Sequence, residues 1–497
     1  MNLVFVTSEA VPFAKTGGLA DVCGALPMAL AKAGHDVSVI MPAYRQARMS
    51  GQVIQETPVR IDVPIASKLV SGKVLESRLP GSNVRVLLLE QDDYYNRAQL
   101  YRENGEDYRD NCERFVYLCR GAMETLRLMH ITPDVIHCHD WQTGLIPALL
   151  RIEYRHARSF QNVASVFTIH NLAYQGRFWH WDMLLTGLDW RYFNWRQMEY
   201  WGDLCLLKTG LVFADKLTTV SPTYAREIQT PEQGCGLDGL LRERSGDLTG
   251  IVNGVDYEIW NSAQDPFIAQ SFDVRTWKPG KAACKAALQR ELNLPVEPRT
   301  PMVGLVGRLV DQKGWDLVAR LIESWAAREP VQWAVLGTGE TVYQELLTRL
   351  AREFPTRVAV RLDFSEPLAH QIEAGSDIFL MPSRFEPCGL NQLYSLRYGA
   401  APVVRATGGL ADTVVDTNPA SLGAGQATGF CFEEYELASL ESALNRARLT
   451  YERRPEEWSR IVEAGMRQDW SWERSASLYE GVYRQAIEAH RASTASN

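Results

Sequence analysis

The sequence predicts an α/β protein built from two Rossmann-like, doubly wound domains that face each other across a cleft. Three observations predict this class. The chain has 497 residues, which is more than one ordinary core holds and indicates two to three domains. Short apolar runs alternate with amphipathic stretches over roughly the first half, which is typical of a parallel sheet covered by helices. The same alternation restarts after residue 300, which indicates a second domain of the same kind.

Composition excludes several classes of protein. The 52 basic and 60 acidic residues give a net charge of −8, which argues against non-specific binding to nucleic acid. No apolar stretch approaches the ~20 residues that a membrane span needs, and the N-terminal MNLVFVTSEA lacks the basic segment of a signal peptide. Nine scattered cysteines without a CxxC pair indicate free thiols in a reducing compartment. We therefore expect a cytoplasmic protein without nucleic-acid or membrane partners, of undetermined oligomeric state.

The first half opens with a strand, a glycine-bearing loop and a helix. Leu3 to Val6 is apolar, the loop runs to Gly18, and Leu19 to Ala33 has helical periodicity before a second strand at Val37 to Met41. The loop lacks GxGxxG, so this βαβ unit does not predict an NAD site. We further expect strands at 59–65, 84–89, 135–137, 164–169, 216–220 and 248–252, a polar loop over 92–112 and a helix over 114–130.

The second half begins after a connecting segment. Residues 257–300 are polar and irregular, which suits a connection between domains. We then expect strands at 302–306, 333–336, 358–362, 378–381 and 402–404 with helices between them, and a final helical stretch over 470–490.

One stretch of this second half, IFLMPSRFEPCGLNQ, has the form of a ligand-binding turn. Ile378 to Met381 is a short buried strand, and Pro382 ends it because proline cannot continue a central ladder. The loop that follows holds Glu386, and a helical pattern starts at Gly389. Ligands of open α/β sheets bind at the carboxyl ends of strands, so we favour a functional role for Glu386 over that of a solvated surface acid.

Basic residues lie where a diphosphate would need them. Arg308 and Lys313 share the loop GRLVDQKG after a predicted strand, and Lys15 lies in a loop of the other half. Arginine binds phosphate oxygens as a fork and lysine as a point charge, so these cations could stabilise a departing nucleotide without a metal. The alternative is that they are ordinary surface charges. No DxD motif stands at a strand end, and the cluster at 137–139 lacks a second group at zinc spacing, so we expect no metal.

Two loops echo one another. Residues 16–22 read TGGLADV and residues 407–414 read TGGLADTV, each where a strand–loop–helix is expected. Paired glycines let a backbone approach a ligand closely, although two ordinary βα turns would have the same pattern. His139, Asp140 and His170 end strands of the first half and could line an acceptor cleft, with a purely structural role for His139 left open.

Tryptophan is frequent, with 14 residues, and several lie between Trp179 and Trp201. Such a cluster is either part of a core or a surface that faces carbohydrate. The sequence pattern leaves both readings open.

The motifs KTGGLADV, HDW, THNLAYQG, NGVD, GRLxxQKG and SRFEPCGLNQLY occur in this order, and with them nearly the whole chain resembles the bacterial glycogen synthases and plant starch synthases. The resemblance implies the GT-B glycosyltransferase fold, with an N-terminal domain of residues 1–252 completed by a last helix at about 472–497, and a C-terminal domain of residues 253–471. It implies retaining transfer of glucose from ADP-glucose to the non-reducing end of an α-1,4-glucan, with release of ADP and no cofactor. Many relatives in the wider clan have a second glutamate eight residues after the first. Here that position is Tyr394, as in the glycogen and starch synthases.

The resemblance also implies roles for individual residues. Lys15 matches a donor-binding lysine, and Arg308 and Lys313 match a diphosphate-binding pair. Glu386 matches the essential glutamate, with Asp140 and His170 also matching active-site positions, so these two residues and Glu386, Arg308 and Lys313 are the expected catalytic set. The residues expected to bind substrate are Lys15, Glu9, Gly17, Gly18, Asp21, Tyr101, Asn253, Cys388, Gly389, Leu390, Thr407, Gly408 and Gly409.

Three other functions remain open from the sequence. A sugar-nucleotide epimerase on the same fold would need no polymer acceptor, and a non-catalytic glucan-binding protein would tolerate the loss of the charged residues above. A glucan synthase that uses UDP-glucose would keep every motif. A dehydrogenase is disfavoured because GxGxxG is missing.

Overall fold

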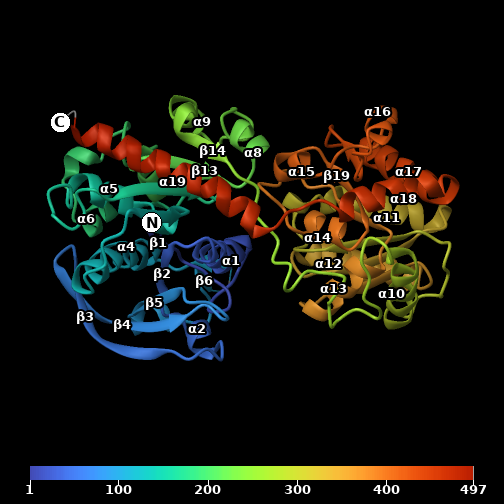
Figure 1. The fold of residues 1–497 in the computed structure, drawn as a ribbon, viewed down its shortest axis with the longest axis horizontal. Coiled ribbons are helices and arrows are strands. Elements are labelled where there is room, and N and C mark those ends of the chain that lie inside the picture. Colours follow the sequence, from blue (N-terminus) through green and yellow to red (C-terminus); the bar gives the residue numbers. More distant parts are fainter. Residues whose placement is uncertain (104, 496–497) are drawn as a thin grey trace. The chain divides into compact units, whose positions relative to one another are not determined.

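We analysed a computed structural model of the chain that describes residues 1–103 and 105–495, so the last two residues of the expected C-terminal helix lie outside it. The chain divides into two compact units (Figure 1). Unit 1 holds Met1–Gly254 with Trp472–Asn497, and unit 2 holds Val255–Ser471.

Unit 1 is built on a nine-stranded sheet in the order β14-β13-β9-β8-β1-β2-β5-β4-β3. The seven strands from β14 to β5 run parallel. The strands are β1 (Asn2–Val6), β2 (Asp36–Pro42), β3 (Gln55–Ile65), β4 (Lys68–Arg78), β5 (Arg85–Glu90), β8 (Val135–His139), β9 (Ala164–Ile169), β13 (Lys216–Thr219) and β14 (Leu248–Gly250).

The prediction of a wholly parallel sheet was wrong for the edge of unit 1. The strands β3 and β4 pair antiparallel, and β4 is also antiparallel to β5. Only Ala66 and Ser67 separate β3 from β4, and Ala66 has a φ of +51°. A connection this short can only join antiparallel neighbours, because a parallel crossover needs a dozen residues or more.

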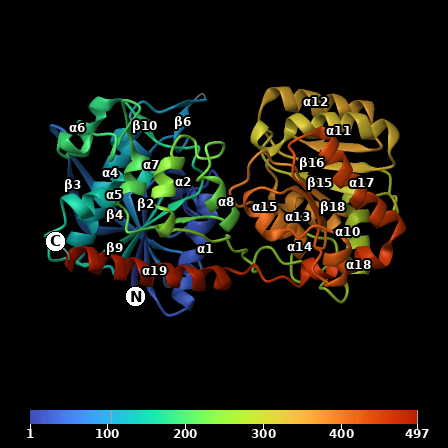
Figure 2. The same ribbon diagram turned by 90° about the horizontal axis from the view of Figure 1, so that it is seen from above.

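The helices of unit 1 lie against this sheet. Figures 1 and 2 both show the C-terminal helix α19 (Trp472–Ala495) beside α1 (Gly18–Lys32), so the chain returns to unit 1 at its end. The Tyr483 hydroxyl of α19 lies 2.9 Å from Nδ1 of His137 in β8, which joins α19 to the sheet. The other helices are α2 (Arg45–Met49), α3 (Asp92–Tyr95), α4 (Asn111–Leu128), α5 (Leu145–Ile152), α6 (Met183–Thr186), α7 (Leu206–Phe213), α8 (Pro222–Glu227) and α9 (Asp238–Glu243), with the 3-10 turns η1 (Trp141–Thr143), η2 (His180–Asp182), η3 (Trp190–Tyr192) and η4 (Ser245–Asp247).

Small strands complete unit 1 outside the main sheet. The expected loop over 92–112 contains α3 and a short hairpin, so the prediction of a loop throughout this segment was wrong. The hairpin is β6 (Arg102–Glu103) with β7 (Glu106–Asp107), and a second small sheet holds β10 (Arg177–Phe178), β12 (Asp203–Cys205) and β11 (Glu199–Tyr200).

Unit 2 holds a six-stranded sheet whose strands all run parallel, in the order β17-β16-β15-β18-β19-β20. Numbered within the unit, this is the order 3-2-1-4-5-6 of a dinucleotide-binding fold. The strands are β15 (Met302–Val306), β16 (Gln332–Leu336), β17 (Val358–Arg361), β18 (Ile378–Met381), β19 (Ala401–Arg405) and β20 (Phe430–Phe432).

Helices cover both faces of this sheet, as the buried apolar strands require. Trp333 and Val335 of β16 belong to one core cluster, and their neighbours Ala334 and Leu336 belong to another, because successive side chains point to opposite faces. Figure 2 shows α11 and α12 on one side of the sheet. The helices are α10 (Trp277–Glu291), α11 (Trp315–Arg328), α12 (Thr341–Glu353), α13 (Glu366–Gly375), α14 (Asn391–Arg397), α15 (Gly408–Thr413), α16 (Pro419–Gly423), α17 (Leu437–Arg453) and α18 (Pro455–Met466), with the turn η5 (Asp311–Lys313).

The prediction that residues 257–300 are irregular throughout was wrong, because α10 lies within them. This helix starts with Trp-Lys-Pro-Gly-Lys, and it buries Lys281, Lys285 and Gln289 among its apolar residues. The buried face therefore contains polar side chains, and the apolar periodicity that would reveal a helix is weakened. Pro279 is tolerated because it lies in the first turn, where its missing N–H has no intrahelical acceptor.

A buried ion pair joins α10 to the sheet at the amino ends of its two central strands. The Lys285 Nζ lies 2.6 Å from Oδ2 of Asp377 and also donates to the carbonyl of Thr300 at 2.6 Å. The same Asp377 oxygen accepts the backbone N–H of Met302 at 2.9 Å. Asp377 precedes β18 and Met302 begins β15, so this carboxylate fixes the start of both strands.

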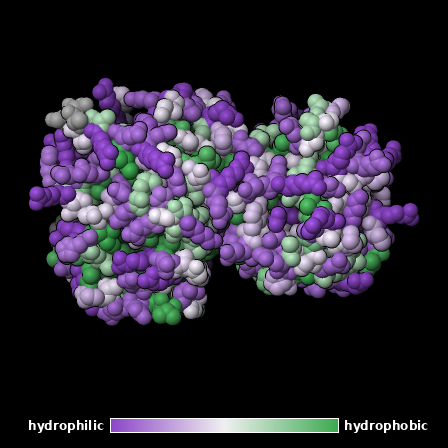
Figure 3. Space-filling view, viewed as in Figure 1, coloured by the Kyte–Doolittle hydropathy of each residue, from purple (hydrophilic) through white to green (hydrophobic). Residues whose placement is uncertain are grey.

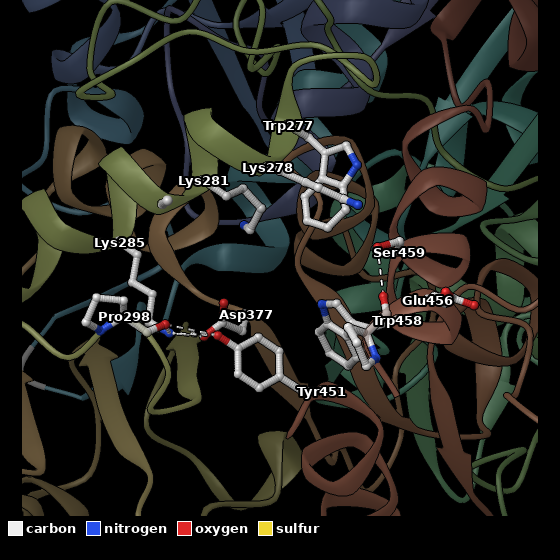
Figure 4. A pocket seen from close by; sticks show the side chains of 12 residues that line it. Trp277, Lys278, Lys281, Lys285, Pro298, Asp377, Tyr451, Glu456, Trp458 and Ser459 are labelled. Atoms are coloured by element: carbon white, nitrogen blue, oxygen red, sulfur yellow. Dashed lines mark hydrogen bonds and ion pairs between the residues drawn. The ribbon is translucent and has the colours of Figure 1, made fainter. Parts of the chain in front are cut away.

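Figure 4 shows this pair at one side of a cavity of about 530 Å³. The indoles of Trp277 and Trp458 line the cavity from α10 and α18, and Lys278 extends beside Trp277. Lys281 also lines it, but its ammonium donates to the carbonyls of Ala374 at 2.9 Å and Tyr398 at 3.0 Å, at the ends of two helices. Burial lowers the pKa of Lys281 to about 8. The buried ammonium groups of Lys281 and Lys285 thus already have hydrogen-bond partners within the protein.

The surface shows no broad apolar region on the face drawn in Figure 3, where apolar residues are scattered among hydrophilic ones. Among the described residues, none of the helices combines the length and the apolarity that crossing a membrane requires.

The buried ion pair of α10 leads to a prediction about stability. Lys285→Met leaves the Asp377 carboxylate buried without its cation, which should lower the free energy of unfolding by about 3 kcal/mol. Lys278→Met, at an exposed lysine of the same helix, should change it by less than about 0.5 kcal/mol. Urea unfolding followed by circular dichroism measures both variants, and equal stabilities would contradict the role of the pair.

Candidate active site

The strand order of unit 2 reverses between β15 and β18. These two strands are hydrogen-bonded neighbours, although β16 and β17 lie between them in the sequence. The chain therefore leaves β15 and β18 towards opposite sides and opens a crevice at their carboxyl ends, which is the usual ligand site of open α/β sheets. The loop after β15 holds Arg308 and Lys313, and the loop after β18 holds Glu386. The topology thus brings together three residues that lie up to 78 positions apart in the sequence.

Glu386 is buried in this crevice and has two partners. Its Oε2 lies 2.6 Å from Nζ of Lys313 and accepts a hydrogen bond of 3.0 Å from the Ser383 hydroxyl. The lysine is about a quarter exposed, so the pair combines a buried carboxylate with a cation that a ligand can reach. Ser383 was not among the predicted residues, although its place at the start of the same loop was a signal.

Arg308 lies at the edge of the same crevice and is exposed. Its guanidinium lies 3.4 Å from Oε1 of Gln312, and its carbonyl accepts the indole N–H of Trp315 at 3.0 Å. The backbone carbonyl of Gln312 accepts the N–H of Arg384 at 2.9 Å, which joins the two loops. Arg308 therefore has a fixed backbone and a guanidinium with donors left for a ligand.

Glycines allow the loops to pack this closely. Gly314 has a φ of +81°, and a Cβ there would lie 2.3 Å from the carbonyl oxygen of Pro382. Gly408 has a φ of +46°, and its Cβ would lie 1.9 Å from the carbonyl oxygen of Glu386. Any larger residue at either position would displace the Glu386 loop.

The second TGG loop lies directly against the Glu386 loop. The N–H of Gly409 donates to the carbonyls of Glu386 at 3.1 Å and Pro387 at 3.2 Å. The structure thus brings the expected substrate-binding residues of unit 2 beside Glu386, and their binding of a ligand stays a prediction. These residues are Cys388, Gly389, Leu390, Thr407, Gly408 and Gly409.

Unit 1 has the same reversal between β1 and β8, and the loops there gather the predicted residues of the first half. Glu9 follows β1, and its Oε1 accepts hydrogen bonds of 2.6 Å from the hydroxyls of Thr16 and Tyr101. Its second oxygen accepts the backbone N–H of Thr16. Tyr101 therefore does join Glu9, and burial raises the pKa of its hydroxyl well above the usual value, so it stays a neutral donor.

The KTGG loop lies open. The Lys15 ammonium is 2.6 Å from Oδ1 of Asp21, and about half of the lysine side chain is exposed. Gly17 and Gly18 are exposed, and a Cβ at either would meet no atom within 4 Å. These two glycines are not required by packing within the described residues, which distinguishes them from Gly408 and Gly409.

Asp140 is buried at the end of β8 in an unusual conformation, with a φ of +56°. Its Oδ1 accepts the backbone N–H of His170 at 2.7 Å. Burial raises the pKa of its carboxyl to about 7, although hydrogen bonds from the backbone of His170 and Asn171 oppose this. Asp140 therefore changes charge near neutral pH.

The histidines around Asp140 are neutral. Nδ1 of His139 lies 3.0 Å from Nε2 of His170, and burial lowers the pKa of His170 to about 3. Burial also holds the pKa values of His137 and His139 well below their usual range. The contact of His137 with Tyr483 was not predicted, because nothing in the sequence pairs the last helix with that strand.

Asn253 is the remaining residue that was expected to bind substrate. It is buried just after β14, and its side-chain oxygen has no hydrogen-bond partner within the residues that the structure describes. Its role in binding stays a prediction. Among the described residues, no group of three or more histidine, cysteine, aspartate or glutamate side chains is placed to hold a metal ion.

Comparisons with known proteins bear on this arrangement. Residues 2–243 match the family described as starch synthase catalytic domain, and residues 290–463 match glycosyl transferases group 1. The chain is 46% identical to a glycogen synthase of Rhodopirellula baltica, over 99% of each protein. It is 50% identical to a glycogen synthase of Anaeromyxobacter sp. strain K, over 97% of this chain and 99% of that one.

The chain belongs to the glycogen and starch synthase family.

A solved structure agrees with this assignment. The catalytic domain of starch synthase IV from Arabidopsis thaliana superposes with a TM-score of 0.88 at 33% identity, over 98% of this chain and 99% of that one. A sucrose-phosphate synthase from Thermosynechococcus elongatus shares the fold, with a TM-score of 0.57 at 17% identity. The predicted family, the GT-B fold class and the prediction of a glycosyltransferase are thereby confirmed.

The raised pKa of Asp140 predicts how the stability of this protein depends on pH. A carboxyl whose pKa is about 7 when folded and 3.8 ordinarily stabilises the fold fully below pH 3.8, and loses that contribution as the pH rises through 7. Asp140→Asn removes the titration but can still accept the N–H of His170. Its free energy of unfolding relative to the wild type should therefore rise by about 2 kcal/mol between pH 5 and pH 8.

Urea unfolding at the two pH values measures this difference. The control is Val166→Ala in the buried strand β9, which destabilises unit 1 without removing a titrating group. It should lower the free energy of unfolding by the same amount at both pH values. A difference between Asp140→Asn and the wild type that stays constant with pH would contradict the buried, titrating carboxyl.

Proposed function

We propose that this glycosyltransferase, which elongates a glucan by glucosyl transfer, takes its glucose from ADP-glucose. It adds the glucose with retention to the non-reducing end of an α-1,4-glucan and releases ADP. The observation that carries this proposal is the ion pair between Lys313 and Glu386 at the strand reversal of unit 2, with Arg308 in the same loop as Lys313. The starch synthase IV relative is bound to ADP and acarbose, which supports an adenine nucleotide as the leaving group.

The cations of unit 2 suit a departing diphosphate. Negative charge grows on the diphosphate as the bond to glucose breaks, and charged donors fixed in place stabilise it without reorganising. Arg308 would bind phosphate oxygens through its fork, and the Lys313 ammonium would act as a point charge. The role of Lys15, in the open KTGG loop of unit 1, stays a prediction.

Glu386 suits a binding role more than a nucleophilic one. Its Oε2 already accepts from Lys313 and Ser383, so its orientation is fixed and its charge is partly neutralised. We assign it to hydroxyls of the donor glucose. The transfer is then a same-face displacement, in which the acceptor oxygen bonds to C1, the bond from C1 to the diphosphate breaks, and the hydroxyl proton passes to the diphosphate.

Unit 1 would supply the acceptor side. Burial keeps the histidines beside Asp140 neutral, so they add no positive charge to this region, which suits a neutral glucan better than a phosphate. We also place the enzyme in the cytoplasm, in keeping with nine free cysteines.

A transfer assay decides among the open alternatives. The protein is incubated with glycogen and either labelled ADP-glucose or labelled UDP-glucose, and the label in the polymer is counted. We expect incorporation from ADP-glucose. Preference for UDP-glucose would overturn the donor assignment, and a changed sugar nucleotide without labelled polymer would indicate the epimerase. A protein that binds glycogen but transfers nothing would be the non-catalytic alternative.

Removal of either cation should slow the reaction. Arg308→Ala and Lys313→Ala should each lower kcat/KM for ADP-glucose about 100-fold, because each removes about 3 kcal/mol of charge stabilisation at the diphosphate. Lys278→Ala is the matched control, since it removes an exposed lysine of unit 2 outside the crevice. Near-normal kcat/KM in either variant would show that the substituted residue does not act in the donor site.

We also propose that the reaction needs no metal ion, because protein cations supply the charge that a divalent ion would otherwise supply. Incorporation from ADP-glucose should then be unchanged after treatment with EDTA and gel filtration. Loss of activity that returns on adding Mg²⁺ or Mn²⁺ would contradict this.

A further inference from the structure

Unit 1 exposes several tryptophans next to one another. The side chains of Trp179, Trp181 and Trp190 are 63%, 49% and 38% exposed. Indole rings lose much surface on folding and are usually largely buried, so an exposed group of them commonly marks a binding surface. These residues come from the segment between β10 and α7, where the sequence left a core and a carbohydrate surface open.

Ring contacts, together with one step along the chain from Phe178 to Trp179, connect this group to the residue that follows Asp140. We define the aromatic run as Trp141, Phe178, Trp179, Trp181, Trp190 and Phe193. Trp141 directly follows Asp140, and its ring centroid lies 5.6 Å from that of Phe178. Trp179 is the next residue along the chain.

Beyond Trp179 the run continues outward. The rings of Trp179 and Trp181 lie 6.4 Å apart, and those of Trp181 and Trp190 lie 5.4 Å apart. Phe193 ends the run 5.2 Å from Trp190. The run therefore starts at a buried residue beside Asp140 and reaches solvent. In Figure 2, α6 and β10 lie at the side of unit 1 away from α19.

The fold holds these rings in place. Met183 and Thr186 of α6 are fully buried, and the carbonyl of Thr186 accepts two hydrogen bonds, of 2.8 and 2.6 Å, from the buried Arg120. Asp189 accepts the N–H of Arg191 at 2.8 Å and so begins the turn that carries Trp190. The exposed rings are thus attached to an anchored segment, which lowers the entropy lost on binding.

The exposed rings fit a neutral sugar polymer. A glucose ring presents C–H groups on its faces and hydroxyls around its edge, so it stacks on an indole while its hydroxyls bond to nearby polar groups. His180 and Asp182 alternate with the tryptophans along the turn η2 and could supply such groups. A broad apolar partner would fit less well, because polar side chains interrupt the rings.

We propose that the aromatic run binds the acceptor glucan where it extends outward from Asp140, on several glucose units beyond the reacting end. This inference rests on the proposed function. The run would increase the affinity for long chains and leave short acceptors unaffected, because a short acceptor ends before Trp179.

The test compares Trp179→Ala/Trp181→Ala with Trp195→Ala. Trp195 is 70% exposed in the same segment, and within the described residues its ring contacts Arg196 and no aromatic ring. Affinity electrophoresis in gels containing glycogen measures binding, and KM and kcat are measured with glycogen and with maltotriose. The double variant should bind glycogen about tenfold more weakly, with a raised KM for glycogen and unchanged kinetics with maltotriose. Trp195→Ala should match the wild type.

A second measurement needs no variant. N-bromosuccinimide oxidises exposed indoles, and mass spectrometry locates the modified residues. Maltoheptaose should protect Trp179 and Trp181 of the wild-type protein and leave Trp195 unprotected.

Two results would overturn the inference. One is unchanged mobility in glycogen gels together with an unchanged KM for glycogen in a folded double variant. The other is oxidation of Trp179 and Trp181 that maltoheptaose does not slow. If these residues instead form a contact between copies of the chain, the double variant will change the elution volume in gel filtration but not the affinity for glycogen. Failure of the wild type to label any acceptor would overturn the proposed function and not this inference alone.

Discussion

The ion pair between Lys313 and Glu386 is the contact on which the candidate donor site depends. It joins the loops that follow β15 and β18, and it exists because these strands are neighbours at the point where the strand order reverses. At the other end of the same two strands, the Asp377 carboxylate fixes Met302 and Lys285. Both ends of the central strand pair are therefore held by charged groups, which leaves little freedom for the loops to separate.

The parallel strands of both units reverse their order beside the first strand, but the two units differ in their electrostatics. The crevice of unit 2 presents cations that a ligand can reach, with a buried carboxylate to orient Lys313. The corresponding region of unit 1 keeps its histidines neutral by burial and raises the pKa of Asp140 to about 7. This difference underlies our proposal that unit 2 binds the charged nucleotide and unit 1 the neutral sugar chain. Two units of similar fold can differ in this way because the loops and not the strands carry the chemistry.

The sequence was a good guide wherever the pattern is local. The strands β9 and β18 begin and end where predicted. β18 is a continuous apolar run between Asp377 and Pro382, and β9 is rich in β-branched and aromatic residues and ends before the polar pair His170-Asn171. Lys313 and Glu386 were expected near one another and form an ion pair, since parallel strands deliver their following loops to one edge of the sheet. Information that depends on distant contacts was absent from the pattern. The helix α10 buries lysines whose partners lie elsewhere, and the bond between Tyr483 and His137 joins residues 346 positions apart.

The central claim is that Lys313 and Glu386 act as one unit on the donor. A double-mutant cycle in kcat/KM for ADP-glucose tests this most directly, with Lys313→Ala, Glu386→Ala and the variant that carries both. Residues that act as a unit are strongly non-additive, so the double variant should be within about tenfold of the slower single variant. If instead the two losses multiply, the residues act independently, and the account of the pair as the organising contact is wrong.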